Sequence, residues 1–272
     1  MIDTPGVILD RFRLSGRVAI VTGAGRGIGA ATALAMAEAG ADVVLTARTK
    51  EQLDAVALDV RNTGQRAVVH PADVNDLDAL ATVVDDTITA FGRVDIVVNN
   101  AGGTAPRPFL DTTPGYLERA FHFNVTTAFA LSRLVTPHLL ETATAEQPAA
   151  IVNIASAMGR LRDRGFVAYG TAKAALVHLT RLMAIDLAPR IRVNAIAVGS
   201  VATTSLETVL TNDDLRREMV ARTPLHRLGR PDDIALAALY LASPAGSFIT
   251  GKVLEVDGGI ESPNLALGLP DL

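Results

Sequence analysis

Two residues capable of acid–base chemistry stand four positions apart, Tyr169 and Lys173, at the head of the helix-like run 174–187. Residues i and i+4 project from the same face of a helix. A tyrosine pKa is ordinarily about 10, and a cation within a few ångströms lowers it by roughly 1–3 pH units. We therefore expect a phenol able to exchange a proton near neutral pH. By itself this spacing is more typical of an ordinary surface pair, so the surrounding sequence must decide.

Two further polar residues precede this pair at positions that suit a reaction site. Ser156 comes thirteen residues before Tyr169, just after the apolar run 150–154, which predicts a buried strand. The carboxyl ends of parallel strands face the ligand crevice, so we expect its hydroxyl there. Asn124 lies among apolar residues of a predicted helix, where its amide needs a buried partner. The alternatives are a strand-end cap for Ser156 and a helix-bending core amide for Asn124.

Short runs rich in valine and isoleucine alternate with longer alanine- and leucine-rich segments at helical spacing. The short runs lack a polar side, as expected of strands buried on both faces. The predicted strands are 18–21, 42–45, 67–69, 95–98, 150–154, 192–196 and 252–256. The predicted helices are 30–39, 51–62, 76–90, 116–140, 172–187 and 232–242.

Strand followed by helix, repeated, predicts parallel βαβ units. We expect one α/β domain over residues 1–272, a Rossmann fold with a doubly wound, seven-stranded parallel sheet and helices on both faces. Residues 1–15 would be an N-terminal extension. The ligand crevice should lie where the strand order reverses.

A glycine-rich turn, 22–29, joins the first predicted strand to the first predicted helix. Glycines permit a tight turn and close approach of a pyrophosphate, whose charge the helix N-terminus then meets. A turn that binds nothing is the alternative, but the placement between strand and helix favours a nucleotide. The predicted contacts are Gly23, Gly25, Arg26, Gly27, Ile28 and Gly29.

Several motifs together resemble the short-chain dehydrogenase/reductase family, in particular NADP-type members such as 3-oxoacyl reductases and hydroxysteroid dehydrogenases. The turn has the family's TGxxxGxG spacing, 99–102 matches its NNAG motif, and 257–259 matches its Asp-Gly-Gly ending. The likeness covers 16–259 and departs from the family at Val198, where proline is usual. The family's catalytic tetrad falls on Asn124, Ser156, Tyr169 and Lys173.

The resemblance also implies where a nicotinamide dinucleotide would bind. Asp73 and the backbone of Val74 match the adenine contacts. In the NNAG motif, Asn99 suits a role in the sheet at least as well as a ligand role, whereas Asn100 favours the cofactor. The implied contacts beyond the glycine turn are Arg48, Asp73, Val74, Asn100, Ala101, Gly102, Tyr169, Lys173, Gly199, Val201 and Thr203.

The end of the second predicted strand indicates which dinucleotide binds. NAD-binding proteins usually place an acid there, on the adenosine ribose, but here Ala47 takes its place. A 2′-phosphate then meets no repulsion, and Arg48 offers it a charge-assisted contact. Arg26 would add a second charge or remain a solvated loop residue. We expect NADP(H) to be favoured over NAD(H).

The chemistry implied by the resemblance is reversible hydride transfer between nicotinamide C4 and a ketone or secondary alcohol. Tyr169 would exchange the proton and Ser156 would orient the oxygen. Lys173 would lower the tyrosine pKa and hold the ribose, and Asn124 would anchor a relay water. The expected substrate is a 3-oxoacyl, steroid-like or other apolar carbonyl. The alternative is a catalytically silent NADP(H)-sensing protein on the same fold.

The segments expected to border the substrate are the loop 158–166 and the polar stretch 204–222, which resembles the family's mobile lid. The loop carries three arginines, which either attract an acidic substrate or, as we favour, form a solvated face. The expected pocket residues are Ser156, Met158, Phe166, Tyr169 and Leu206, and the arginines are Arg160, Arg162 and Arg164.

The tail 260–272 is apolar, and leucines on a tail usually pack on a partner surface. Members of the family are commonly tetramers, so we expect a homotetramer with this tail lying across a neighbouring subunit.

Composition argues against several other classes of protein. The formal net charge is −4 with scattered basic residues, so no nucleic-acid partner is expected. The chain has no cysteine, and its five histidines lack paired metal-ligand spacing, so we expect no metal site. No signal peptide or long apolar stretch is visible, so we expect a cytoplasmic protein without membrane contact.

Overall fold

A computed structural model of the chain describes residues 7–144, 147–265 and 268–269. Its centre is a seven-stranded parallel sheet in the order β3-β2-β1-β4-β5-β6-β7, which confirms the predicted doubly wound α/β fold. The strand order reverses between β1 and β4, so the crevice lies beside these two strands. The strands are β1 Val18–Thr22, β2 Asp42–Ala47, β3 Ala67–Pro71, β4 Ile96–Asn99, β5 Ala149–Ile154, β6 Ile191–Val198 and β7 Val253–Val256.

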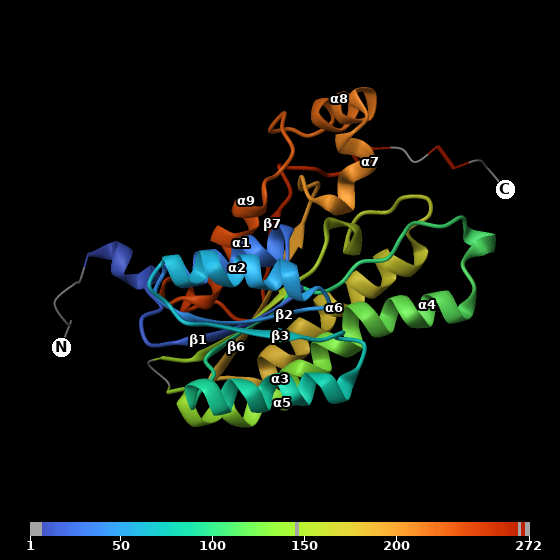
Figure 1. Ribbon diagram of the computed structural model, residues 1–272. Helices are drawn as coiled ribbons and strands as arrows, with labels where there is room; N and C mark the ends of the chain where they lie inside the picture. Colours follow the sequence, from blue (N-terminus) through green and yellow to red (C-terminus); the bar gives the residue numbers. More distant parts are fainter. Residues whose placement is uncertain (1–6, 145–146, 266–267, 270–272) are drawn as a thin grey trace.

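Helices cover both faces of the sheet, with α1, α2 and α9 on one side and α3 and α5 on the other (Figure 1). The longer helices are α1 Gly27–Glu38, α2 Lys50–Asn62, α3 Leu77–Phe91, α4 Pro114–Phe121, α5 Thr127–Thr142, α6 Val167–Leu187, α8 Asp213–Ala221 and α9 Pro231–Ala242. The short ones are η1 Ile8–Phe12, η2 Phe109–Asp111, η3 His122–Thr126, η4 Ala157–Gly159, η5 Thr204–Leu206, α7 Glu207–Leu210 and η6 Pro244–Gly246.

Alternate residues of each central strand fill two different apolar cores. In β1, Ala19 and Val21 pack with α1 and α9, whereas Ile20 packs on the opposite side with α3 and α5. All residues of β1, β4, β5 and β6 are buried, as predicted from their mainly apolar runs without a polar side. The sheet is therefore a rigid frame, and the site is built on its carboxyl edge.

The helix predicted over 116–140 is not a single α-helix. A π-helical turn, η3, separates α4 from α5 and contains Asn124. The Asn124 Nδ2 donates to the Ala120 carbonyl oxygen at 2.8 Å, so the side chain competes for the acceptor that an α-helical amide would use. The helix widens at this point, as π-turns often do at functional sites.

Two segments stand apart from the layers. The predicted lid, 204–222, forms η5, α7 and α8 and rises above the carboxyl side of the sheet (Figure 1). Of the N-terminal extension, residues 7–15 are described, and Leu14 is fully buried there. No helix among the described residues has the length and apolar character needed to cross a membrane.

Candidate active site

The predicted acid–base pair lies on one helix. α6 begins at Val167, two residues before Tyr169, so Tyr169 and Lys173 share a face, with the lysine Nζ 5.8 Å from the tyrosine ring centroid. Lys173 is buried, and its ammonium donates to the Ile154 carbonyl oxygen at 2.8 Å. The lysine is thereby fixed to the end of β5, close to Ser156.

Ser156 faces the tyrosine and also caps a turn. Its Oγ accepts a hydrogen bond from the Met158 backbone N–H at 3.2 Å, as N-cap of η4, and its hydroxyl is hydrogen-bonded with the Tyr169 phenol. The predicted strand-end cap is therefore present together with the pairing to Tyr169. Glycines at 159 and 170 let the turn lie directly on α6, because an added Cβ at Gly170 would lie 2.9 Å from the Met158 carbonyl oxygen.

The side chain of Asn124 is held by the loop that follows β4. Its Oδ1 accepts from the Gly103 backbone N–H at 2.8 Å, and its Nδ2 donates to Thr104 Oγ1 at 3.2 Å. A Cβ added at Gly102 would lie 2.9 Å from both Asn124 Oδ1 and Lys173 Nζ. The asparagine and the lysine thus border the same point, and the glycine of the NNAG motif leaves that point open.

The expected lowering of the Tyr169 pKa is not found. Burial of the phenol raises its pKa, and the hydrogen bond with Ser156 opposes this only in part. Burial also lowers the pKa of the Lys173 ammonium to about 8. Desolvation therefore favours the neutral form of both groups and outweighs the attraction expected from the i,i+4 spacing.

The glycine turn has the backbone shape that its sequence predicts. Gly23 and Gly27 have φ of 63° and 56°, in the left-handed region. A Cβ on Gly29 would lie 2.2 Å from the Gly23 carbonyl oxygen, so only glycine fits there. Gly25 packs on Gln52, and Ile28, half-buried in the first turn of α1, packs on the core.

Asn99 and Asn100 both hold the protein's own frame. The Asn99 amide donates to Ser132 Oγ on α5 and to Asn153 Oδ1 on the neighbouring strand β5. The Asn100 amide donates to the carbonyl oxygens of Thr22 and Gly23, at 2.8 and 3.2 Å. Asn100 thus braces the glycine turn, a structural role that the prediction of a cofactor contact did not include.

Two predicted arginines border the glycine turn. Arg26 is the N-cap residue of α1 and Arg48 follows β2, and both are exposed. Within the described residues, no hydrogen bond or ion pair is found for either guanidinium. An added Cβ at Gly25 would lie 3.7 Å from the Ala47 Cβ, so the alanine borders the turn where an acidic residue would stand in NAD-binding proteins.

The remaining predicted cofactor residues lie at strand ends along the same edge. Asp73, exposed after β3, accepts from the Asn75 side chain at 2.9 Å, and Val74 beside it is buried. Thr203, half-buried, approaches the turn, since a Cβ on Gly27 would lie 3.3 Å from its Cγ2. Gly199, Val201, Ala101 and Gly102 lie in the loops after β6 and β4.

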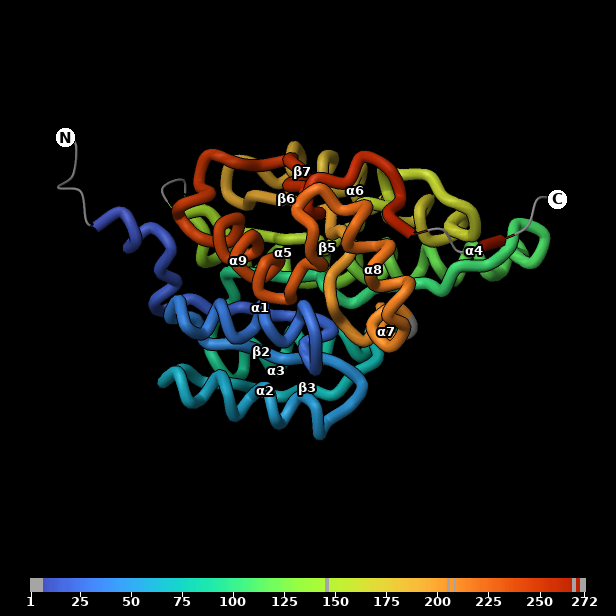
Figure 2. Tube along the Cα trace, turned by 90° about the horizontal axis from the view of Figure 1, so that it is seen from above, coloured from blue at the N-terminus to red at the C-terminus, as the bar shows by residue number. Residues whose placement is uncertain are grey.

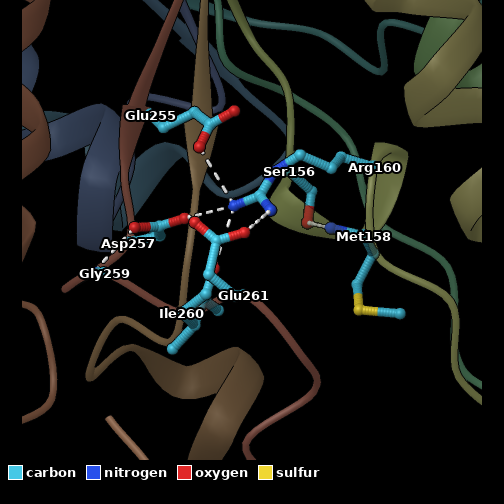
Figure 3. Close-up of polar contacts among 8 residues, drawn as sticks. All are labelled: Ser156, Met158, Arg160, Glu255, Asp257, Gly259, Ile260 and Glu261. Carbon is cyan, nitrogen blue, oxygen red and sulfur yellow. Dashed lines mark hydrogen bonds and ion pairs between the residues drawn. The ribbon is translucent and has the colours of Figure 1, made fainter. Parts of the chain in front are cut away.

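Arg160 is exposed, as the favoured interpretation expects, but it is also paired with acidic residues. Its guanidinium lies among the carboxylates of Glu255, Asp257 and Glu261, at 3.0, 3.1 and 3.0 Å (Figure 3). It also donates to the Ile260 carbonyl oxygen at 2.9 Å. The charge of Arg160, although exposed, is therefore paired with three carboxylates and is not free to attract a substrate. Its partners lie about a hundred positions away along the chain, and no local pattern predicted them.

The other expected pocket residues are spread over two segments. The Phe166 ring lies 6.3 Å from the Tyr169 ring, and Met158 is half-buried in η4. Leu206 lies in η5 of the lid, also half-buried. Arg162 is exposed, and the described part of the chain shows no hydrogen bond or ion pair to it.

The described part of the tail packs on its own chain. The Arg164 Nη1 donates to the Leu269 carbonyl oxygen at 3.0 Å, and the Leu269 Cδ1 lies 2.9 Å from where a Cβ on Gly165 would be. The tail thus reaches the predicted substrate loop within one chain. Leu267, Pro270 and Leu272 lie outside the described residues, and the homotetramer stays a prediction.

The family model described as enoyl-(acyl carrier protein) reductase matches residues 23–261. An uncharacterized oxidoreductase of Mycobacterium tuberculosis is 56% identical over 98% of this chain and all of that protein. The match therefore extends over nearly the full length of both chains.

Two solved structures resemble the chain closely. One, a 7α-hydroxysteroid dehydrogenase complexed with NADH and 7-oxo glycochenodeoxycholic acid, is 38% identical, has a TM-score of 0.88, and is matched over 93% of this chain and 98% of that one. The other, an active-site complex of Pseudomonas aeruginosa RhlG with NADP, is 34% identical, has a TM-score of 0.87, and is matched over 92% and 98%. These relatives bind NADH or NADP. The chain belongs to the short-chain dehydrogenase/reductase family and is an oxidoreductase of carbonyl or alcohol substrates.

Proposed function

We propose that this protein is an NADP(H)-dependent reductase of apolar ketones, which also oxidises the corresponding secondary alcohols. The observation that carries the proposal is the meeting of Tyr169, Ser156 and Lys173 at the end of β5, next to a glycine turn flanked by two arginines without described partners. Each part would suit a surface or a core by itself, but together they suit proton delivery beside a bound dinucleotide.

The hydrogen-bond donors and charges of these residues suit a bound dinucleotide. Lys173 has three N–H donors and one described hydrogen bond, so two remain for the hydroxyls of a ribose. Arg26 and Arg48 would meet the 2′-phosphate, because Ala47 leaves no carboxylate to repel it. When bound, the nicotinamide supplies or accepts the hydride. Of the relatives, RhlG with NADP supports this preference, whereas the dehydrogenase with NADH does not.

Tyr169 would donate the proton to the carbonyl oxygen. Because burial raises its pKa, the phenol stays protonated near neutral pH, which is the form needed for reduction. Ser156 is hydrogen-bonded with the same phenol, so an oxygen placed between them would be oriented by both hydroxyls. For alcohol oxidation the tyrosinate would be the base, and that direction would require higher pH.

Lys173 and Asn124 would return a proton to the tyrosine. The two side chains border the open point beside Gly102, where a water could join them. Asn124 is held for this role by the π-turn and by Gly103, and its orientation is therefore fixed before any ligand binds.

The proposed substrate is apolar because two apolar side chains adjoin the serine and the tyrosine. Phe166 and Met158 adjoin Tyr169 and Ser156, and Arg160, the arginine nearest them along the chain, is held by three carboxylates. The 7-oxo glycochenodeoxycholic acid bound in one related structure carries both a keto group and an acid group, and its keto group agrees with reduction of a ketone.

NADPH consumption with a panel of 3-oxoacyl, steroid and cyclic ketones tests the proposal, with the Tyr169→Phe variant as comparison. We expect turnover of at least one ketone and a loss of roughly 10²- to 10⁴-fold in the variant. NADPH binding should be retained, weakened at most by the loss of one hydrogen bond from the phenol. Intact NADP(H) binding without turnover of any ketone or alcohol would favour a sensing protein.

A further inference from the structure

The chain that follows β7 passes directly over the end of the lid. The Leu225 backbone N–H donates to the Gly258 carbonyl oxygen at 3.2 Å. Gly258 and Gly259 have φ of 73° and 87°, and a Cβ on Gly258 would lie 2.7 Å from Thr223 Cγ2. Only glycine permits this approach. We call residues 257–265 the strap, and the ribbon and tube views both show the red chain after β7 running beside the orange lid (Figures 1 and 2).

One side chain of the strap bonds to both ends of the lid. Asn264, 6% exposed, accepts a hydrogen bond from Ser200 Oγ at 3.0 Å through its Oδ1. Its Nδ2 donates to Thr223 Oγ1 at 2.9 Å. Ser200 precedes the lid, 204–222, and Thr223 directly follows it. A single buried amide therefore links the two points where the lid leaves the body of the protein.

The hydrogen-bonding chemistry fixes the direction of this link. Thr223 Oγ1 donates its proton to the Met219 carbonyl oxygen at 2.8 Å, so toward Asn264 it can only accept. The amide must then present its nitrogen to Thr223 and its oxygen to Ser200. An aspartate could not serve both partners in this way, because a carboxylate cannot donate.

Both ends of the link rest on fixed structure. The Ser200 carbonyl oxygen accepts from the Gly229 backbone N–H at 2.9 Å, which joins it to the segment before α9. The strap is held by Arg160, which donates to the Ile260 carbonyl oxygen and pairs with Glu261. Arg160 directly follows η4, which Ser156 caps, so the strap connects the lid with the loop beside the candidate catalytic serine.

We propose that Asn264 is a positioning residue that fixes the two ends of the lid relative to each other and so sets the position of the lid over the substrate. For its effect on catalysis the proposal rests on the proposed function. The expected effect on the lid does not depend on the proposed function. Without the amide, the Ser200 and Thr223 hydroxyls each lose a hydrogen-bond partner, and the link between the two ends of the lid is broken.

Hydrogen–deuterium exchange of the cofactor-free protein tests the proposal without any substrate. In Asn264→Ala, we expect amide exchange in 204–222 to quicken about tenfold or more, with exchange in β4 and β5 unchanged. Ser262→Ala is the matched control, since Ser262 lies exposed in the same strap. Thr223→Ser keeps the hydroxyl and should exchange like the wild type. Unchanged lid exchange, or an equal increase across the sheet, would overturn the proposal.

Steady-state kinetics on a turned-over ketone then test the link to catalysis. We expect Asn264→Ala to raise KM for the ketone about tenfold and to change kcat less than about threefold, with NADPH affinity retained. Ser200→Ala combined with Asn264→Ala should add little to Asn264→Ala alone, because both remove one network. A lower kcat at unchanged KM would contradict a positioning role. If no ketone is turned over, the proposed function fails, and the exchange result still decides whether Asn264 holds the lid.

Discussion

The cofactor side of the site and the substrate side are held together over very different distances along the chain. In the cofactor turn, one eight-residue motif brings Gly29 so close to Gly23 that no Cβ would fit between them. On the substrate side, Arg160 meets Asp257 and Glu261, which are 97 and 101 positions away. Local spacing therefore builds the part common to a family, whereas contacts between distant segments shape the part that meets the substrate.

The comparison predicts that the largest loss comes from the local motif. Gly29→Ala would put its Cβ 2.2 Å from the Gly23 carbonyl oxygen and 2.5 Å from the Asn100 amide nitrogen. We expect NADPH affinity to fall by at least about 100-fold, because the turn must open. Fluorescence titration measures this. Gly115→Ala is the control, since its Cβ meets only the end of the Arg119 side chain. Wild-type affinity in folded Gly29→Ala would refute the role of the turn.

Lys173→Met separates stability from function at the buried lysine. The folded-state pKa of Lys173 is about 8 against an ordinary 10.5, so the charged lysine costs the fold about 3 kcal/mol below pH 8. Loss of the bond to the Ile154 carbonyl offsets part of the gain. We therefore expect the free energy of unfolding of the variant to be about 1–3 kcal/mol higher than that of the wild type at pH 7.

The stability difference between the variant and the wild type should depend on pH. Between pH 8 and 10.5 the unfolded wild type binds more protons than the folded protein, so wild-type stability rises through that range. The advantage of Lys173→Met should accordingly shrink toward pH 10 in urea unfolding. A less stable variant at pH 7 would show that Lys173 is not held at an energetic cost.

Arg48→Ala tests cofactor choice on the local side. A hydrogen bond to a charged group contributes about 1.5–3 kcal/mol, so kcat/KM for NADPH should fall roughly 10- to 100-fold while that for NADH stays constant. Arg133→Ala, an exposed arginine on α5, is the control. An equal loss for both cofactors would contradict contact with the 2′-phosphate.

Arg162→Gln should give the smallest effect. Its guanidinium is exposed, with no described partner, in the same loop as Arg160, which is held by carboxylates. We expect KM for ketones to change less than about twofold. A rise of tenfold or more for an acidic ketone, measured beside a neutral one, would restore the hypothesis that this loop attracts negative charge.

The sequence predicted what depends on short-range rules. The strands, the glycine turn, and Tyr169 with Lys173 on one helix face were predictable from period and spacing. The π-turn at Asn124 was not predictable, because it arises where a side-chain amide donates to a backbone carbonyl oxygen that an α-helical N–H would otherwise use. Nor could the sequence predict the raised Tyr169 pKa or the partners of Arg160 and Asn264. Burial and pairing between distant residues depend on the assembled fold.

The most direct test of the account follows the label from NADPH deuterated at the transferable C4 position. With a ketone that the wild type reduces, mass spectrometry of the alcohol should show one deuterium at the carbinol carbon. Transfer should be faster from labelled NADPH than from labelled NADH and should be lost in Tyr169→Phe. A protein that binds NADPH but never transfers the label to any ketone, or that transfers it equally well with phenylalanine at position 169, would contradict the account.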